Sequence, residues 1–563
     1  MFPSTRNPAR DSVKSANWEG NAITLLLPSV LPESYALEDL YRELVKGNEE
    51  GQDEELENLL ILASCLKESD RLKATDDGKW YEKLEDYLAK IILPDGKVFS
   101  LDETDDEEEL GKAHKIKQYR GKYTLGILSI SNLLEISSNP SPPPKDSTIL
   151  SLLPFTATTN PWAASQSQQI ATAILEKYSV YIHSSGFLVT YLLQSFIRPI
   201  FSKTPPPRSV TASSRKAAPS SAPPRHFDIR ESSPSRQPWR SSIPYTIPVL
   251  QWIIEHISPD ILRTQAFPLL IPPLLTLLDS SSNSIRVHTL RVIPILFSKM
   301  GDKLLLQTGL GDVFEDAIHP LLLFLPSLTP VEDTLKLLPA GYNALYALCD
   351  ARWPEKKDAD ASESLAVSIN KPSKPTPSTS PSPAQLRLAF LDRIIRHALL
   401  PAHLHCQEIP SVVEILVSQI GLVIPRMGIW GVRHLKDILP IISNILINPF
   451  LPDTTPSLVL KTLETLRDVI LVLWPRISVE EHRLSILQAL AVSYGNIRLQ
   501  SGEKSEEKKR VHEEILKEQQ ETGKVFVAAV RGADDAHAKQ TFEQELVEVI
   551  GANGELASVF RVN

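Results

Sequence analysis

Residues 305–348 read LLQTGLGDVFEDAIHPLLLFLPSLTPVEDTLKLLPAGYNALYAL, and this stretch decides the fold. Gly309 and Gly311 bracket Leu310 in a turn, and Asp312 stands where a helix N-cap is expected. After this turn, hydrophobic residues recur at the three- and four-residue spacing of an α-helix. They are Val313, Phe314, Ala317, Ile318, Leu321, Leu322 and Leu325. The pattern predicts an apolar helix with Phe314 and Leu322 in its buried face.

A second helix is predicted after a turn that contains Pro326 and Ser327. Thr329 can cap this helix, with Pro330 at its first position and Glu332 three residues beyond the cap. Its hydrophobic residues are Leu335, Leu337, Leu338, Tyr342, Leu345 and Leu348. Two such helices joined by a short turn form a hairpin that cannot bury both faces alone. It needs neighbouring hairpins on each side.

Two further stretches repeat the order of helix, proline-marked turn and helix. In residues 269–300, a first helix is expected to kink at Pro272 and Pro273, and a polar turn leads to a second helix. In residues 438–474, Pro440 is expected to open the first helix.

The spacing of these copies indicates their class. Aligning Pro273 with Pro320 gives an offset of about 47 residues, near the upper spacing of HEAT repeats. No stretch alternates between polar and apolar residues as a strand would. The predicted fold is therefore all-α, a HEAT/armadillo-like helical-repeat solenoid with disordered Pro/Ser-rich insertions.

Composition sets further bounds. The 563 residues are too many for one compact core, and 45 prolines against 22 glycines are typical of helical repeats with proline-marked turns and linkers. Three cysteines (Cys65, Cys349 and Cys406) argue against a disulfide framework and indicate a reducing compartment.

The N-terminus lacks the apolar core of a secretory signal, and no apolar run is expected to reach the ~18 residues of a membrane span. A formal net charge of −9 gives no general attraction to nucleic acid.

Shifts in composition predict the organisation of the chain. The expected regions are a disordered N-terminus (1–21), an N-terminal helical region (22–201) with an acidic loop (102–109) and a linker (137–146), a disordered basic Pro/Ser-rich linker (202–242), a HEAT-like solenoid (243–500) with a loop (355–383), and charged C-terminal helices (501–563). In the last region, Glu506 with Arg510 and Glu513 with Lys517 are spaced to pair along a helix that ends the solenoid with a polar face. Residues 540–563 are predicted to form a short terminal helix and a frayed tail.

Two charged segments each allow more than one interpretation. The acidic run 102–109 is either a solvated loop or a docking site for a basic partner, and Thr104 within it suits an acid-directed kinase. The basic segment 202–242 is predicted to be disordered, with contact to nucleic acid or a nuclear address as the alternative. Phe227 and Trp239 are expected to anchor it to the helical surface.

The residues that resemble catalytic or ligand-binding motifs all have structural interpretations. Gly309-Leu310-Gly311 lacks the third glycine and the preceding strand of a phosphate loop. His403, His405 and Cys406 have no second ligand pair at zinc spacing, so a helix-end surface is favoured. Asp312, Glu315 and Asp316 lie in the first turn of a helix, where capping and the helix dipole explain them. We therefore expect no enzyme activity, cofactor, metal or small-molecule ligand.

Three runs within the opening stretch resemble the Tti-two family, the Tel-two-interacting proteins. They are TGLGDVFEDAI at 308–318, LPSLTPVED at 325–333 and LLPAGYNALYAL at 337–348. The resemblance is sharp over about residues 265–350, looser to about 480 and weak before Ser241. The residues that carry it, as structural positions, are Gly309, Leu310, Gly311, Asp312, Phe314, Leu325, Pro326, Leu328, Thr329, Pro330 and Tyr342.

The resemblance implies a function as a scaffold. Members of this family are subunits of the Triple-T co-chaperone complex with Tti-one and Tel-two, and of the fungal assembly ASTRA. The complex works with the ninety-kilodalton heat-shock chaperone and the Rvb ATPases on phosphatidylinositol-3-kinase-related kinases, which regulate TOR and DNA-damage signalling. This chain is accordingly expected in the cytoplasm and nucleus, with no membrane and no direct nucleic-acid contact. A karyopherin-like transport adaptor and a nucleic-acid-associated HEAT scaffold are the alternatives.

Overall fold

A computed structural model gives the fold of the chain. It describes residues 2–15, 23–45, 52–73, 78–100, 109–136, 143–202, 209–211, 213–218, 237–354, 381–500 and 506–560. These residues form two compact units, Met1–Ser282 and Asn283–Asn563. Most of the described residues are helical, and two isolated bridges, Tyr35 with Leu72 and Val210 with Lys216, are the extended pairings among them. The prediction of an all-α helical-repeat solenoid is confirmed.

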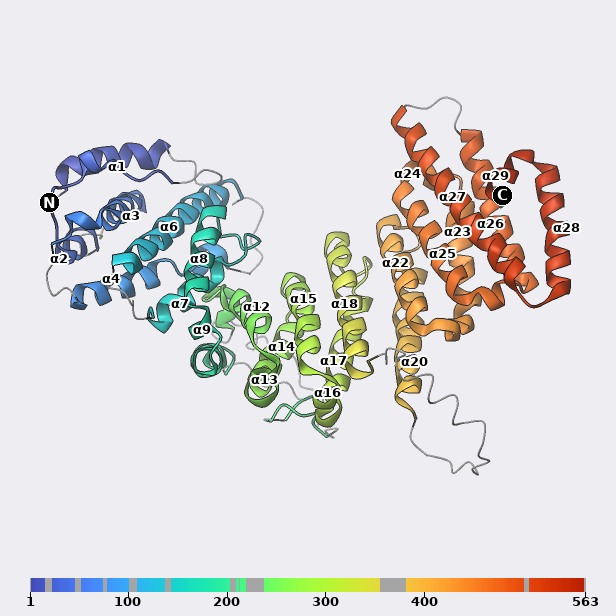
Figure 1. Cartoon of the computed structure of the whole chain (residues 1–563), viewed down its shortest axis with the longest axis horizontal. Helices are drawn as coiled ribbons and strands as arrows, with labels where there is room; N and C mark the ends of the chain where they lie inside the picture. The colour runs from blue at the N-terminus through green and yellow to red at the C-terminus, as the bar shows by residue number, and fades with distance from the viewer. Residues whose placement is uncertain are drawn as a thin grey trace. The chain divides into compact units, whose positions relative to one another are not determined.

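The N-terminal unit is built around one long helix, α6 (Glu109–Ile136), which packs against α3 (Gln52–Lys67), α4 (Gly78–Ile91) and α8 (Ser165–Lys177) (Figure 1). The other helices of this unit are α1 (Pro3–Ser15), η1 (Pro28–Val30), α2 (Leu37–Leu40), η2 (Tyr41–Val45), η3 (Ser69–Arg71), α5 (Gly96–Phe99), α7 (Asp146–Leu152), η5 (Leu153–Phe155), α9 (Ser179–Ile182), η6 (Gly186–Ile197), α10 (Arg198–Phe201), α11 (Pro238–Ser241), α12 (Thr246–His256), α13 (Pro259–Ile261), η8 (Leu262–Ala266) and α14 (Phe267–Leu278).

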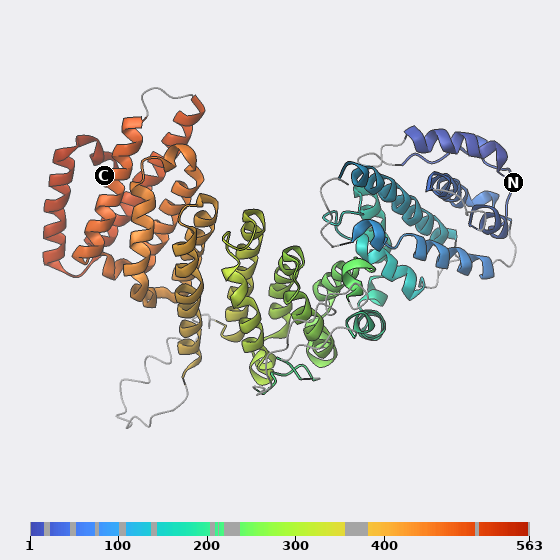
Figure 2. The same cartoon turned by 180° about the vertical axis from the view of Figure 1, so that it is seen from behind.

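In the C-terminal unit, five long helices form one row in which each packs on the next: α15 (Asn283–Met300), α18 (Val331–Arg352), α22 (Pro410–Met427), α25 (Pro456–Ile477) and α27 (Glu506–Gly532). Helices of a second row pack against the first: α17 (Leu310–Ile318), α20 (Pro383–Ile394), α23 (Leu435–Ile447) and α26 (Glu480–Gln500) (Figure 2). The connecting and terminal helices are α16 (Asp302–Thr308), η9 (His319–Leu323), η10 (Ile395–Leu399), α21 (Leu400–Cys406), η11 (Gly428–His434), α24 (Leu451–Thr454), α28 (Ala536–Ala552), η12 (Gly554–Leu556) and α29 (Ala557–Phe560). This two-row stacking is the arrangement of a helical-repeat solenoid.

The predicted repeats correspond to real hairpins, with corrections. Residues 305–348 span α17 and α18, and residues 438–474 span α23 and α25. The stretch 269–300 crosses the boundary between the two compact units, which falls after Ser282. Pro440 lies inside α23 and does not open it, because apolar burial begins earlier, at Leu435 and Ile438.

Residues 3–15 form helix α1, contrary to the prediction of disorder over 1–21, and residues 16–21 lie outside the described residues. Within α1, Ala9 is fully buried, and the Thr5 hydroxyl donates to the Val30 carbonyl oxygen at 3.0 Å. Arg10 pairs with Glu57 of α3, with Nε 2.8 Å from Oε1. Helix α1 contains few apolar residues, so its hydrophobic pattern did not predict a helix.

Part of the predicted linker 202–242 is also helical. Trp239 in α11 is buried and stacks on Phe201, with ring centroids 5.8 Å apart and planes 12° from parallel. The predicted anchoring role of Trp239 is confirmed, whereas Phe227 lies outside the described residues. Most of the acidic run 102–109 and of the loop 355–383, and the greater part of the linker 137–146, also lie outside them.

The C-terminal region differs from the predicted polar cap and frayed tail. Helix α27 buries Ile515 and Phe526 and packs along α25. The tail returns as α29, and Val559 lies against Gly523 so closely that a Cβ there would be 2.4 Å from the Val559 carbonyl oxygen. In this charged helix Glu506 pairs with Lys509, three residues away, rather than with Arg510.

Two helical stretches are longer and more apolar than the sequence analysis expected. Pro259–Leu278 and Pro410–Ile447 each contain a window long and hydrophobic enough to cross a membrane, so the expectation that no such run exists is wrong. Half of each window is buried within the protein, and core packing accounts for that composition.

All three cysteines are buried and free of disulfides. Burial raises the pKa of the Cys65 and Cys349 thiols to about 12 and also raises the pKa of Cys406.

Candidate protein-interaction site

The turn before α17 depends on glycine. Gly309 ends α16 and caps α17 with a φ of 68°, in the left-handed region that suits glycine. Helix α17 starts at Leu310, so Asp312 lies inside the helix and is not its N-cap as predicted. Gly311 is packed beneath the side chain of Arg352, where a Cβ would lie 2.6 Å from Nε. A larger residue at 311 would therefore push Arg352 away.

Arg352 joins the two helices of this hairpin. Its Nη2 lies 2.7 Å from Oδ1 of Asp312, and its Nη1 lies 3.3 Å from Oε2 of Glu315. Arg393 of α20 reaches the other oxygen of Glu315 at 2.5 Å. Burial raises the pKa of the Glu315 carboxyl, and the two guanidinium groups partly offset that rise. We call Asp312, Glu315, Arg352 and Arg393 the charge cluster.

The charge cluster corrects the interpretation of the acidic residues as capping groups alone. Asp312 and Glu315 bind arginines from two other helices, and Asp316 is exposed. Arg393 follows the loop 355–383 in the sequence, so its ion pair with Glu315 connects α20 to α17 on the two sides of that insertion. Helical periodicity does not predict this contact.

The apolar side of the hairpin is packed as predicted. Phe314 is fully buried and meets Phe297 of α15 edge to face, with centroids 5.1 Å apart, and Leu322 is also fully buried. Gly341 lets α18 approach η9, since a Cβ there would lie 2.7 Å from Leu322 Cδ2. Tyr342 is buried, and its hydroxyl has no hydrogen-bond partner among the described residues.

The turn between the hairpin helices contains both buried and exposed signature residues. Leu325 and Thr329 are buried, whereas the side chain of Leu328 is 90% exposed. Helix α18 begins at Val331 with Pro330 as its N-cap residue, one position later than predicted. Pro326 is half-buried. Leu328 and Pro330 are the exposed members of the signature set, and Leu328 is the larger apolar side chain of the two.

A second apolar surface lies between α25 and α27. A cavity of about 370 Å³ is lined by Leu471, Trp474, Val525, Ala528, Ala529 and Gly532, which we call the C-terminal groove. The side chains of Leu471 and Trp474 are 57% and 41% exposed. Arg467 of α25 pairs with Glu518 of α27 at 2.8 Å and fixes the spacing of the two helices. An exposed, concave apolar surface with polar groups at its edge is typical of a protein-binding site.

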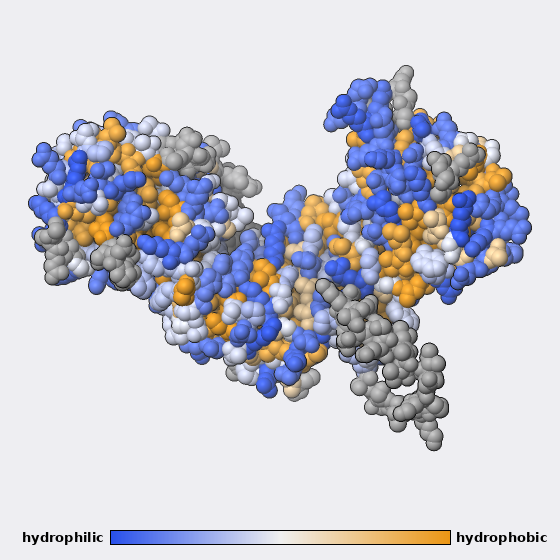
Figure 3. Space-filling view, viewed as in Figure 1, coloured by the Kyte–Doolittle hydropathy of each residue, from blue (hydrophilic) through white to orange (hydrophobic). Residues whose placement is uncertain are grey.

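Figure 3 shows hydrophobic residues among polar ones on the visible face of the C-terminal unit. The C-terminal groove was not predicted from the sequence. Its residues follow ordinary helical periodicity, and only the tertiary packing shows which of them stay uncovered.

The histidines and the cysteine considered as zinc ligands do not line either of these surfaces. His403, His405 and Cys406 lie at the end of α21, with Cys406 buried and His405 exposed. Within the described ranges, no group of three or more His, Cys, Asp or Glu side chains is placed to hold a metal ion.

The stacked hairpins, the long helical rows and the exposed apolar surfaces define a HEAT-like α-solenoid, a class of protein built for binding other proteins. A sequence model of the Tti2 family matches residues 148–453, more than half of the chain. The chain therefore belongs to the Tti2 family, as the resemblance of residues 305–348 implied.

Other comparisons give distant matches. The karyopherin Kap121p bound to Ste12p is 13% identical, with a TM-score of 0.28, over 93% of this chain and 57% of that one. Pds5 in the Pds5–Scc1 complex is 11% identical, with a TM-score of 0.23, over 96% of this chain and 80% of that one. This chain thus spans little more than half of the karyopherin's length. Comparison with curated proteins gives no match.

Proposed function

We propose that this chain is a non-catalytic scaffold subunit of the Triple-T co-chaperone complex. In that assembly it joins Tti-one and Tel-two. With the ninety-kilodalton heat-shock chaperone and the Rvb ATPases, the complex assists newly made phosphatidylinositol-3-kinase-related kinases. We place this activity in the cytoplasm and the nucleus.

The family match over residues 148–453 carries the proposal. It contains the whole hairpin 305–348, with its charge cluster and its exposed Leu328. A solenoid of this kind offers long surfaces for partners, and every acidic residue of the charge cluster is engaged by arginine rather than held for catalysis.

We assign the contact with Tti-one to the C-terminal unit and centre it on the C-terminal groove. Trp474 and Leu471 offer large apolar side chains at the rim, and Ala528, Ala529 and Gly532 leave room for a partner helix. Burying a tryptophan in such a position is the usual source of binding energy at an interface. The occupant would be an amphipathic helix whose apolar face lies in the groove.

Co-expression of the full chain with tagged Tti-one and Tel-two tests the assignment. Replacing Leu471 and Trp474 together by glutamate should lower the affinity for Tti-one by roughly 30-fold or more, the effect of losing an interface hot spot. A matched control is Leu404→Glu, because Leu404 is 67% exposed on α21 in the same unit and lies outside the groove.

Two results would contradict the proposal. Capture of Tti-one by the double variant at wild-type affinity would remove the groove from the interface. Failure of the wild-type chain to bind any Triple-T subunit would remove the proposed function itself.

A further inference from the structure

A row of exposed arginines lies in the C-terminal unit, where α20, η10 and η11 meet. These three elements contain four arginines and a single acidic residue. The side chains of Arg393, Arg396 and Arg433 are 51%, 52% and 43% exposed. Beside them, Ile429 and Trp430 of η11 are 49% and 58% exposed. We call these five residues the basic surface.

The carboxylates that pair with these arginines are less exposed than the arginines themselves. Arg396 donates from Nε to Oδ2 of Asp392 at 3.0 Å, and Nη1 of Arg433 lies 3.7 Å from Oδ1 of the same carboxylate. Arg393 pairs with Glu315, as described above. The side chains of Asp392 and Glu315 are only 22% and 8% exposed. The guanidinium groups therefore face solvent, while most of the negative charge lies beneath them.

The charges at this place do not cancel. The connected ion pairs join the arginines Arg352, Arg393, Arg396 and Arg433 to the carboxylates of Asp312, Glu315 and Asp392. Four arginines against three carboxylates leave one positive charge in excess. Lys436 and Asp437, which follow η11, are both exposed and offset each other. The surface as a whole therefore presents positive charge to a partner.

The short helix η11 holds the apolar part of the surface in place. Gly431 is packed so closely that a Cβ there would lie 3.3 Å from Cδ1 of Ile424 on α22 and 3.4 Å from Cδ2 of Leu473 on α25. Side chains three residues apart in a 3-10 helix share a face, and the guanidinium carbon of Arg433 lies 5.9 Å from the centre of the Trp430 ring. A partner would therefore meet a preformed pair of arginine and tryptophan.

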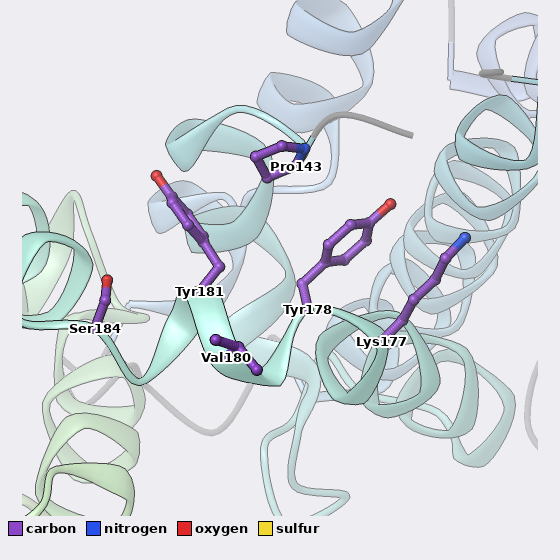
Figure 4. A pocket seen from close by; sticks show the side chains of 6 residues that line it. All are labelled: Pro143, Lys177, Tyr178, Val180, Tyr181 and Ser184. Carbon is purple, nitrogen blue, oxygen red and sulfur yellow. The ribbon is translucent and has the colours of Figure 1, made fainter. Parts of the chain in front are cut away.

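A pocket in the N-terminal unit combines a cation with aromatic rings in a different way (Figure 4). Its volume is about 470 Å³, and Lys177 is the one charged residue among the side chains labelled there. The Tyr181 hydroxyl donates to Oδ1 of Asp146 at 2.5 Å, and Val180 is 90% exposed. A single lysine among tyrosines does not define the charge of a partner as the three arginines of the basic surface do.

The composition of the basic surface matches one kind of partner. Tryptophan and arginine are the residues that most often dominate the binding energy of protein interfaces. Carboxylates fit the planar guanidinium group, and an apolar side chain would cover Ile429 and Trp430. A nucleic acid would bring phosphates to the arginines but would leave Ile429 in water. We propose that the basic surface binds an acidic segment of a partner protein that also carries apolar side chains.

In this arrangement the carboxylates of the segment pair with the solvent-facing sides of Arg396 and Arg433, and an apolar side chain lies against Trp430. No covalent step is involved. None of the five residues lines the C-terminal groove, so the inference does not depend on the contact with Tti-one or on the Triple-T complex.

Fluorescence polarisation with the full-length chain tests the proposal. The probe is a fluorescein-labelled peptide in which aspartates alternate with leucines, and its control has asparagine in place of each aspartate. We expect saturable binding of the acidic peptide alone, and weaker binding as the salt concentration rises. Trp430→Ala should weaken it by at least about tenfold, as at an interface hot spot. Arg433→Gln removes one charged contact and leaves Asp392 paired with Arg396, so it should weaken binding by roughly three- to tenfold.

Arg498→Gln is the matched control for Arg433→Gln. The Arg498 side chain is 49% exposed, lies 3.5 Å from the Glu555 carboxylate and is 5.3 Å from the centre of the Tyr494 ring, outside the basic surface. This variant should bind the acidic peptide as the wild type does, and Arg433→Gln should keep the wild-type melting temperature.

Four outcomes would overturn the proposal. The first is equal binding of the acidic peptide and its asparagine control. The second is an unchanged affinity in both Trp430→Ala and Arg433→Gln. The third is tighter binding of a single-stranded oligonucleotide of equal charge, since the partner would then be a nucleic acid. The fourth is binding that appears only after deletion of residues 101–108, because the chain's own acidic run would then be the occupant.

Discussion

At the scale of single residues, Phe314 shows most clearly what holds the hairpin together. It is fully buried against Phe297, so Phe314→Ala would leave a cavity between α17 and α15. We expect a loss of roughly 3–5 kcal/mol in the free energy of unfolding of the C-terminal unit. Chemical denaturation measures it. Leu328→Ala, in the same hairpin but exposed, should change stability by no more than about 0.5 kcal/mol. Equal stability of both variants would contradict the observed packing.

His434 gives a residue-scale prediction for pH. Its side chain is fully buried, and its Nε2 lies 3.0 Å from Oδ1 of Asp392 without the alignment of a hydrogen bond. Burial lowers the pKa of His434, and the neighbouring Arg396 and Arg433 act in the same direction against Asp392.

The folded state therefore binds this proton less readily than the unfolded chain. Above the ordinary histidine pKa of about 6.5, His434 is neutral in both states and does not reduce the free energy of unfolding. As the pH falls below that value, the unfolded chain binds the proton more readily, so the free energy of unfolding decreases. Urea unfolding at neutral and mildly acidic pH should show this loss. His434→Gln should make the free energy of unfolding depend less steeply on pH. An unchanged pH dependence in this variant would contradict the assignment to His434.

At the scale of helices, the charge cluster predicts unequal roles for its two arginines. The side chain of Arg352 is 13% exposed and that of Arg393 is 51% exposed. Arg352→Ala would leave the buried Glu315 with only the solvent-screened Arg393, at a cost of roughly 2–3 kcal/mol. Arg393→Ala should cost less than about 1 kcal/mol in global stability, as for other exposed pairs.

Arg393→Ala should instead act locally. Hydrogen exchange of the α20 amides should become faster, because the tie to α17 is lost, while exchange in α18 should stay as in the wild type. Equal acceleration in both helices would show that the cluster acts as a single unit.

The same elements show how far the sequence determines the fold. Helices α17 and α18 follow from local spacing. Helix α17 starts three positions earlier than predicted, and α18 starts one position later. The pairing of Arg352 with Glu315 joins residues that are distant in the sequence, and periodicity says nothing about such pairs. Helix α1 was missed because its only buried residues, Thr5 and Ala9, are small. The C-terminal groove depends on which faces stay uncovered, and only packing decides that.

At the scale of the whole molecule, the boundary at Ser282 suggests where to divide the chain. A fragment starting at residue 243 would carry α12 and α14, which belong to the N-terminal unit. We expect residues 283–563 to co-purify with Tti-one and residues 1–282 not to do so. Obligate interfaces often bury more than ~2,000 Å², so the full chain expressed alone would expose a large apolar surface. It should therefore self-associate, and co-expression with Tti-one should prevent this. Capture of Tti-one by 1–282 alone would contradict this placement.

The burial of all three cysteines has a practical consequence for labelling. Thiolates are the reactive form, and these thiols are both inaccessible and held protonated. A thiol-reactive dye should therefore ignore the native chain and react with Cys65, Cys349 and Cys406 only after denaturation. Cysteines introduced at the exposed Val180 and Val547 would then be the sole sites of attachment in an otherwise natural sequence. A donor and an acceptor fluorophore at those two positions would report, in real time, changes in the distance between the two units as partners arrive.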